Sequence, residues 1–204
     1  YALDVDEFDV DAWRFESWCR TARAAPEPAS AIAAYEQALA CSGSPFAEFA
    51  DRDWARADVT RLDEMRITAS EECLSLRLDL GQGSTIVGEL EALVSEHPLR
   101  ERPWLLLAMA LHRTGRSADA LRRISAFRSI LRDELGLDPP AAIRGLESRI
   151  LESDPVLMGA PQPLSSRRSR IPRLEATPLV GRSADLAGIV TLLGEHCLVT
   201  LVGP

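Results

Sequence analysis

Four cysteines and three histidines are the residues of this sequence best able to bind a metal ion or to carry redox chemistry. They are Cys19, Cys41, Cys73, Cys197, His97, His112 and His196. No two cysteines form a Cys-x-x-Cys pair, and none lies at a metal-ligand spacing from a histidine. We therefore expect no metal site, and we interpret the cysteines as buried or neutral thiols of a reducing compartment, with a redox or zinc site as the alternative.

His97 is the candidate for acid–base chemistry, because it stands in a Glu-His-Pro phrase at the expected end of a helix. No nucleophile or paired carboxylate is tied to it by a motif, so we interpret it as a capping or packing residue. The four tryptophans occupy helical positions and are expected to lie in the core or to line a groove; they are Trp13, Trp18, Trp54 and Trp104. We predict no catalytic residue and no enzymatic activity for this chain.

The charge of the chain argues against a free-standing nucleic-acid binder. Lys and Arg total 23 against 31 for Asp and Glu, and every cation is an arginine. Non-specific binding to nucleic acid depends on cations that neutralise phosphates. No apolar run approaches the roughly 20 residues that span a bilayer, and nothing resembles a signal peptide, so we predict a cytoplasmic protein without a membrane partner.

Apolar residues recur at helical spacing over nearly the whole length before Pro155, which predicts an all-α fold. The first helix is expected from near Asp9 to before Pro26, the second from Pro28 to about Gly43, and a long third from about Asp51. The third carries one apolar seam, formed by Trp54, Leu62, Met65, Ala69, Cys73, Leu76 and Leu80. The last apolar face, with Ile143, Leu146 and Ile150, precedes a predicted linker over residues 155–178 that contains five prolines.

A repeat organises these helices, because Gly81 and Gly115 are 34 residues apart and equivalent helices follow each of them. The order of residues after Pro98 matches the tetratricopeptide pattern, with Trp104, Leu107, Ala108, Leu111, Gly115 and Ala120. We therefore predict antiparallel helical hairpins, in which small residues allow close packing. Gly115 is expected to adopt a positive φ in a turn crowded by the neighbouring helix, and Ser117 to cap the helix that follows.

Several phrases, in order over roughly residues 4–154, resemble the bacterial transcriptional activation domain of the SARP family of AfsR-, DnrI- and RedD-like regulators. They are Asp9-Val10-Asp11 leading to Phe15, Arg61-Leu62 with Glu64, the run from Glu96 to Arg102, Gly115-Arg116 with Ala120-Leu121, and the run from Glu134 to Pro139. The resemblance implies a tetratricopeptide-like helical domain over 1–154, placed directly after an N-terminal winged-helix DNA-binding domain. Tyr1-Ala2-Leu3 looks like the tail of that domain.

A second resemblance begins at Leu179, because Val180, Gly181 and Arg182 are similar to the entry motif of signal-transducing P-loop ATPases. It implies that these three residues lie by the adenine, that residues 197–202 form a buried strand, and that Gly203 begins the phosphate loop. Residues 179–204 are therefore expected to be a truncated start of an ATPase domain, a short α/β fragment. The chain stops before the lysine and the Ser/Thr of the loop, so we expect Val180, Gly181, Arg182 and Gly203 to form at most a partial, non-functional site with no cofactor. The full-length protein could still bind ATP and Mg²⁺.

Together the resemblances imply a regulatory and protein-interaction module that links a DNA-binding domain to an ATPase switch in a transcriptional activator. It would contact DNA through the N-terminal domain, support a homodimer and lie near RNA polymerase. Two alternatives stay open: a generic tetratricopeptide adaptor that binds peptides and has no role in transcription, or the sensor segment of an NTPase.

Overall fold

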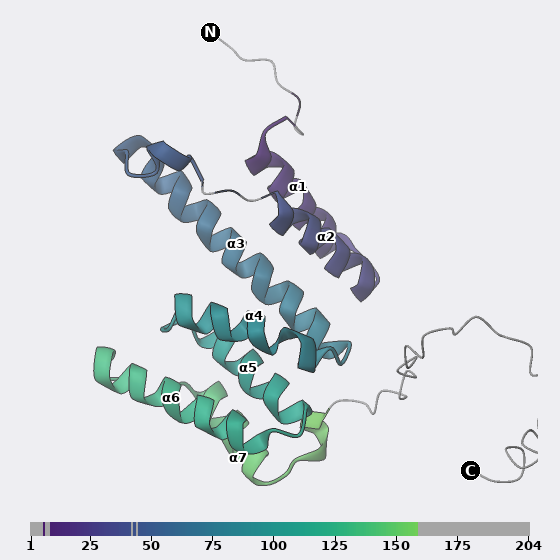
Figure 1. The fold of residues 1–204 in the computed structure, drawn as a ribbon, viewed down its shortest axis with the longest axis vertical. Helices are drawn as coiled ribbons and strands as arrows, with labels where there is room; N and C mark the ends of the chain where they lie inside the picture. The colour runs from purple at the N-terminus through teal and green to yellow at the C-terminus, as the bar shows by residue number, and fades with distance from the viewer. Residues whose placement is uncertain (1–5, 7–8, 42, 44, 159–204) are drawn as a thin grey trace, which may run out of the picture. The chain divides into compact units, whose positions relative to one another are not determined.

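The computed structural model describes residues 6, 9–41, 43 and 45–158, and within them it contains seven α-helices, two 3₁₀ turns and no β-strand (Figure 1). The elements are α1 (Asp11–Ala24), α2 (Pro28–Ala40), η1 (Ala47–Phe49), α3 (Asp53–Asp79), α4 (Gly83–Glu96), α5 (Glu101–Arg113), α6 (Ser117–Leu135), α7 (Ala141–Leu151) and η2 (Pro155–Met158). The all-α prediction is confirmed. None of these helices is long and apolar enough to cross a lipid bilayer.

The long helix α3 belongs to two separate hydrophobic cores. Ala69 and Cys73 pack with α1 and α2 in the first core, whereas Leu74 and Leu78 pack with α4, α5 and α6 in the second. Figure 1 shows the pair α1 and α2 on one side of α3 and the remaining helices near its C-terminal half. A helix of 27 residues therefore connects the two halves of the domain without a break.

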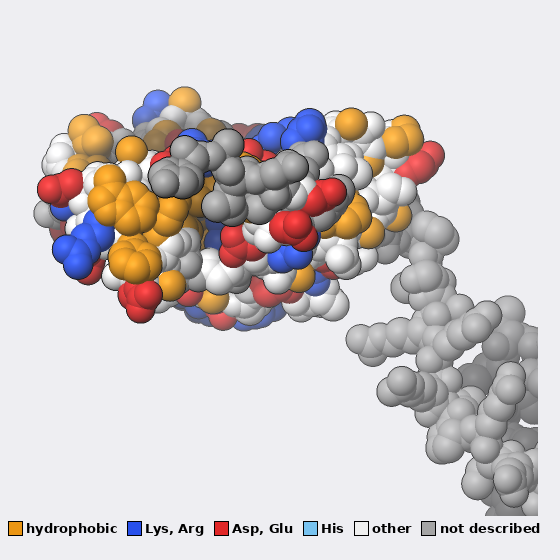
Figure 2. Space-filling model, turned by 90° about the horizontal axis from the view of Figure 1, so that it is seen from above, with side chains coloured by type: hydrophobic (Ala, Val, Ile, Leu, Met, Phe, Trp, Pro, Cys, Tyr) orange, Lys and Arg blue, Asp and Glu red, His pale blue; other side chains and the backbone are white. Residues whose placement is uncertain are grey.

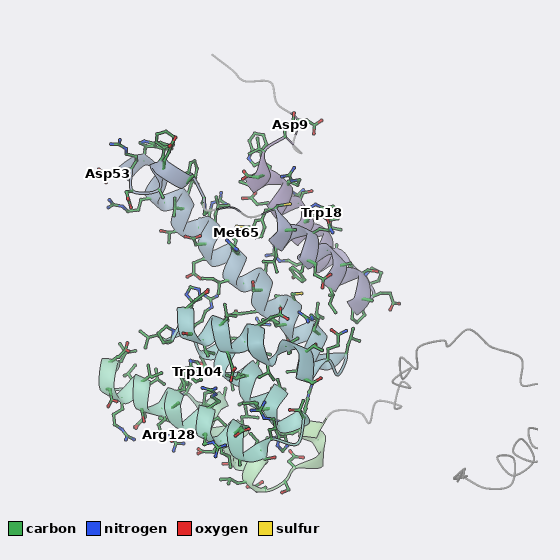
Figure 3. All side chains as sticks on the ribbon, in the orientation of Figure 1. Asp9, Trp18, Asp53, Met65, Trp104 and Arg128 are labelled. Atoms are coloured by element: carbon green, nitrogen blue, oxygen red, sulfur yellow. The ribbon has the colours of Figure 1, made fainter. Side chains whose placement is uncertain are left out.

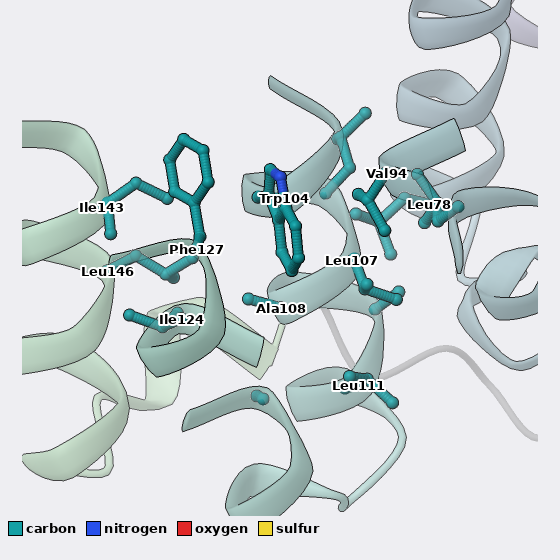
Figure 4. Close-up of a cluster of buried hydrophobic side chains, with 14 of the residues drawn as sticks. Leu78, Val94, Trp104, Leu107, Ala108, Leu111, Ile124, Phe127, Ile143 and Leu146 are labelled. Carbon is teal, nitrogen blue, oxygen red and sulfur yellow. The ribbon is translucent and has the colours of Figure 1, made fainter. Parts of the chain in front are cut away.

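The second core shows why the repeat contains small residues. Trp104 and Phe127 stack with their ring centroids 5.3 Å apart, and the side chain of Trp104 donates a hydrogen bond from Nε1 to the carbonyl of Pro98 (Figure 4). Ala108 and Ala120 are fully buried, one on α5 and one on α6. Their short side chains allow the two antiparallel helices to approach closely, as the sequence predicted.

Gly81 and Gly115 form equivalent turns, which confirms the predicted repeat. Their φ values are +74° and +81°, and after each glycine the next backbone amide donates to the carbonyl five residues earlier, at 2.9 and 2.8 Å. The predicted crowding at Gly115 is wrong, since a Cβ there would meet nothing within 4 Å. Ser117 makes no helix cap either: its Oγ lies 2.9 Å from Nδ1 of the buried His112.

Two Gly-to-Ala substitutions should change stability in opposite directions. Gly115→Ala is expected to cost about 1–2 kcal/mol, because an L-residue is strained at a left-handed φ even with space around it. Gly145→Ala is expected to stabilise the domain by about 0.5–1 kcal/mol, because Gly145 lies inside α7 and its added Cβ meets open space. Urea denaturation of both variants beside the parent measures the difference. Shifts of the same sign would show that backbone conformation does not govern these positions.

The tryptophans are less uniformly buried than the sequence predicted. Trp104 is buried and Trp18 is half-buried, but Trp13 and Trp54 are exposed. The predicted core position is therefore wrong for Trp13 and Trp54. Trp54 lies in the first turn of α3. The α3 residues of the first core come later in the helix, beginning with Met65, which is labelled in Figure 3. The predicted apolar seam of α3 therefore begins later than Trp54.

The helical domain continues through Met158, four residues beyond the predicted boundary at 154. After α7 the chain turns back at η2 and buries Leu157 in the second core. The guanidinium of Arg113 fastens this turn, since Nε donates to the carbonyl of Leu157 and Nη1 to that of Leu78, each at 3.0 Å. The rest of the predicted linker, and all of residues 179–204, lie outside the described residues.

Candidate interaction surface

Arg100 connects two of the sequence phrases that carried the family resemblance. It occupies the residue just before α5 and reaches back to α3, where Nε donates to Oε1 of Glu71 at 2.5 Å and Nη1 to Oε2 of Glu64 at 2.6 Å. A third contact, 3.3 Å long, joins Nη2 to the hydroxyl of Thr68. The bond to Glu71, followed by that to Glu64, raises the pKa of the Arg100 guanidinium. The phrase residues Glu64 and Arg100 therefore join α3 to α5.

Glu71 is the unusual member of this network because its carboxylate is buried. Its side chain is only 4% exposed, whereas that of Glu64 is 60% exposed. Burying a carboxylate is costly unless it is paired and hydrogen-bonded, and Arg100 supplies both conditions. The pair therefore fixes the position of α5 on α3.

Two further ion pairs extend the same arrangement along α3. Arg61 contacts Glu16 of α1 at 2.5 Å, and Arg102 of α5 contacts Glu72 at 2.8 Å. Both pairs are partly exposed to solvent, so each contributes little to stability. Together with the Arg100 network they attach α3 to the helix pairs on both of its sides.

A cavity of about 400 Å³ opens between the start of α1, the α2–α3 connection and α3. Buried Phe15 and Leu62 lie at its base, and Phe46 forms part of its wall. Two charged residues also line it, Asp11 and Arg66. The Asp11 carboxylate accepts a hydrogen bond of 2.8 Å from the next backbone amide, whereas Arg66 makes no hydrogen bond or ion pair with any described residue.

Three exposed aromatic rings stand beside this cavity. The rings of Phe46 and Phe49 lie 5.7 and 6.1 Å from that of Trp54, and the three residues are 40%, 47% and 64% exposed. Figure 2 shows hydrophobic side chains gathered at the end of the domain where α3 begins. The backbone presents these rings in an uncommon conformation, with φ of +56° at Phe46 and +39° at Ala47. A contiguous apolar patch of this kind is typical of a surface that meets a partner. We call these three residues the aromatic triad.

Of the residues singled out for metal, redox or acid–base chemistry, His196 and Cys197 lie outside the described residues. Cys19 and Cys73 are buried free thiols as predicted, and burial raises the pKa of Cys73 to about 11. Cys41 is half-buried and donates from its thiol to the carbonyl of Gln37. His97 is the residue directly after α4, and its backbone amide donates to the carbonyl of Leu93. Within the described residues, no three His, Cys, Asp or Glu side chains group in a way that could hold a metal ion.

The predicted nucleotide-site residues Val180, Gly181, Arg182 and Gly203 lie outside the described residues, so that site remains a prediction. The Glu71 network, the cavity and the aromatic triad were not predicted. The network had one usable signal: Glu64, Thr68 and Glu71 are spaced to share one face of a helix. The aromatic triad had no such signal in the sequence, because its rings are brought together by a loop whose conformation does not follow from periodicity.

Residues 10–151 match the family model of the bacterial transcriptional activator domain. The chain is 33% identical over 159 residues to the regulatory protein DnrI of Streptomyces peucetius. This match covers 76% of the chain and 58% of DnrI. It is 44% identical over 104 residues to the regulatory protein AfsR of Streptomyces coelicolor, covering 51% of this chain and 10% of AfsR. The chain thus spans less than two thirds of the length of each of these relatives.

A solved structure gives a similar result for the fold. It is that of Mycobacterium tuberculosis EmbR in complex with a low-affinity phosphopeptide, which superposes with a TM-score of 0.69 at 25% sequence identity. The superposition covers 95% of this chain and 47% of EmbR. The helical arrangement around α3 is therefore shared with a transcriptional regulatory protein.

Proposed function

This chain belongs to the bacterial transcriptional activator domain family, and from that membership we propose that it is the regulatory and protein-interaction module of a SARP-type transcriptional activator. The match over residues 10–151 is the observation that carries the proposal. The relatives AfsR and DnrI are named regulatory proteins and EmbR is named a transcriptional regulatory protein, so we propose no enzymatic role for the module. Because the relatives act on transcription, we place the protein in the cytoplasm.

In the complete protein the module lies between an N-terminal winged-helix DNA-binding domain and a C-terminal ATPase domain. The similarity of Val180, Gly181 and Arg182 to a nucleotide-binding entry motif supports the second part of this arrangement. ATP and Mg²⁺ are proposed as ligands of the complete protein, where the lysine and hydroxyl of a phosphate loop would hold them. The sequence that follows Pro204 in the gene decides whether such a loop exists.

The module works by contact, and the aromatic triad is its contact surface. The rings of Phe46, Phe49 and Trp54 are the exposed aromatic cluster at the free end of α3. Exposed aromatic residues supply large contact areas and are enriched at the centres of protein interfaces. RNA polymerase, or a second copy of the regulator in a homodimer, is the partner that this role requires.

The same surface also favours the alternative of a peptide-binding adaptor with no role in transcription. Tetratricopeptide-like domains and a cavity beside exposed aromatic rings suit a peptide ligand equally well. A DNA-binding domain encoded upstream distinguishes the two functions, since an adaptor has no use for one.

The isolated chain should bind duplex DNA only weakly at physiological salt. Its net charge of −8 opposes binding to phosphates, and no described helix presents a cluster of unpaired cations suited to a groove. A gel-shift titration of this chain against promoter fragments from its own gene cluster, beside the complete protein, measures the difference. Tight, sequence-selective binding by the chain alone would show that DNA is read by the helical domain itself.

A further inference from the structure

We propose that the cavity between α1 and α3 is a binding site for a small organic anion with an apolar body. This site goes beyond the contact function proposed above and does not depend on it. It assigns to the module a ligand of its own, bound next to the surface that meets a partner.

The size and lining of the cavity fit a small molecule. Its volume of about 400 Å³ lies at the lower end of the roughly 300–1,000 Å³ found for ligand pockets. Phe15, Leu62 and Phe46 give it a mainly apolar wall, and only a few polar groups interrupt that wall. Such a lining is typical of sites that bury a ligand's apolar part and orient it through one or two polar contacts.

The charge of the ligand follows from the two ionic residues of the wall. Asp11 lies in the first turn of α1, where its carboxylate already accepts a backbone hydrogen bond and is favoured by the helix N-terminus. Arg66 has no partner among the described residues. The Arg66 guanidinium lies at the edge of an apolar cavity, and a guanidinium in such a place pairs best with a carboxylate or a similar oxyanion.

Occupation of the cavity would be felt at the aromatic triad through Phe46. This residue lines the cavity and also packs edge-on against Trp54, with ring centroids 5.7 Å apart. Its φ of +56° lies in a region that an L-residue seldom occupies, so the loop depends on its neighbours to hold it there. A ligand that contacts Phe46 therefore changes the surroundings of the Trp54 indole, and Trp54 becomes a natural reporter of binding.

The test uses two probes of the same shape, 2-naphthoate and its neutral amide 2-naphthamide, titrated into the chain while tryptophan fluorescence is recorded. We expect saturable binding of naphthoate that is about three- to tenfold tighter than that of the amide, as for a charge-assisted contact at a partly exposed site. Trp54→Phe should remove most of the fluorescence change but leave the heat of binding in calorimetry. Equal affinities for acid and amide would overturn the proposal and indicate an apolar groove for a protein segment instead.

Two variants and one control locate the site. Arg66→Gln should weaken naphthoate to the level of the amide, whereas Arg132→Gln, which alters another arginine without a described side-chain partner on α6, should leave binding unchanged. Ala12→Leu should fill part of the cavity and weaken both probes, since Ala12 is a half-buried lining residue with room beside it. Equal losses for Arg66→Gln and Arg132→Gln, or undisturbed binding to Ala12→Leu, would place the probe elsewhere and contradict the assignment.

Discussion

Glu71→Ala is expected to lower the free energy of unfolding by about 2–4 kcal/mol, somewhat less than the usual loss on breaking a fully buried ion pair. The substitution removes the only buried carboxylate among the described residues and leaves the Arg100 guanidinium without its shortest contact. Arg100 is itself one quarter exposed and keeps Glu64, so part of its charge remains compensated. Because the pair between Arg100 and Glu64 remains, the expected loss in the free energy of unfolding extends down to about 2 kcal/mol.

Glu64→Ala is the matched control, because it removes a second carboxylate from the same guanidinium. Glu64 is largely exposed, and an exposed ion pair is worth about 0–1 kcal/mol. Urea denaturation followed by circular dichroism gives both free energies. If the two variants lose equal stability, burial does not strengthen the contact between Glu71 and Arg100. The special role given to Glu71 in attaching α5 to α3 would then be wrong.

The Arg100 network matters for function because α3 links the two cores. Ala69 and Cys73 belong to the first core and Leu78 to the second, so a shift of α5 on α3 changes the orientation of one half relative to the other. The aromatic triad stands at the N-terminal end of the same helix, which contributes Trp54 to it. We propose that α3, as one unbroken helix, transmits shifts in the second core to the aromatic triad.

The helices and their turns could be predicted because they depend on local sequence. Gly81 and Gly115 end their helices in the same left-handed conformation, and the 34-residue spacing predicted this equivalence. The buried stripe with Trp104, Leu107 and Leu111 followed from helical periodicity in the same way. In each case a few neighbouring residues determine the structure.

The candidate surface could be predicted only in small part, because its features join residues that are distant in sequence. Glu71 is buried only because Arg100 reaches it from 29 residues away, and no rule of periodicity places a buried carboxylate there. Trp54 fits the helical seam yet is exposed, since no described helix covers the first turns of α3. Leu157 follows a proline and looks like the start of a linker, but Arg113 draws it back onto the domain.

The most direct test of the central proposal is transcription in vitro by the complete protein with an altered triad. Phe49→Ser combined with Trp54→Ser should reduce activated transcription close to the basal level, because it removes the aromatic contact area without touching either core. Promoter binding in a parallel gel shift should stay unchanged, since the proposed DNA-binding domain lies outside this module. The matched control is Leu135→Ser with Leu151→Ser, which replaces two apolar residues of similar exposure, 50% and 66%, on α6 and α7.

The measured quantity is the amount of transcript at equal promoter occupancy for the parent and the two double variants. We expect transcript to be lost in the triad variant and retained in the control. Equal transcript from all three proteins, or a complete protein that neither binds nor activates any promoter, would contradict the proposal that this helical domain acts by contact in a transcriptional activator.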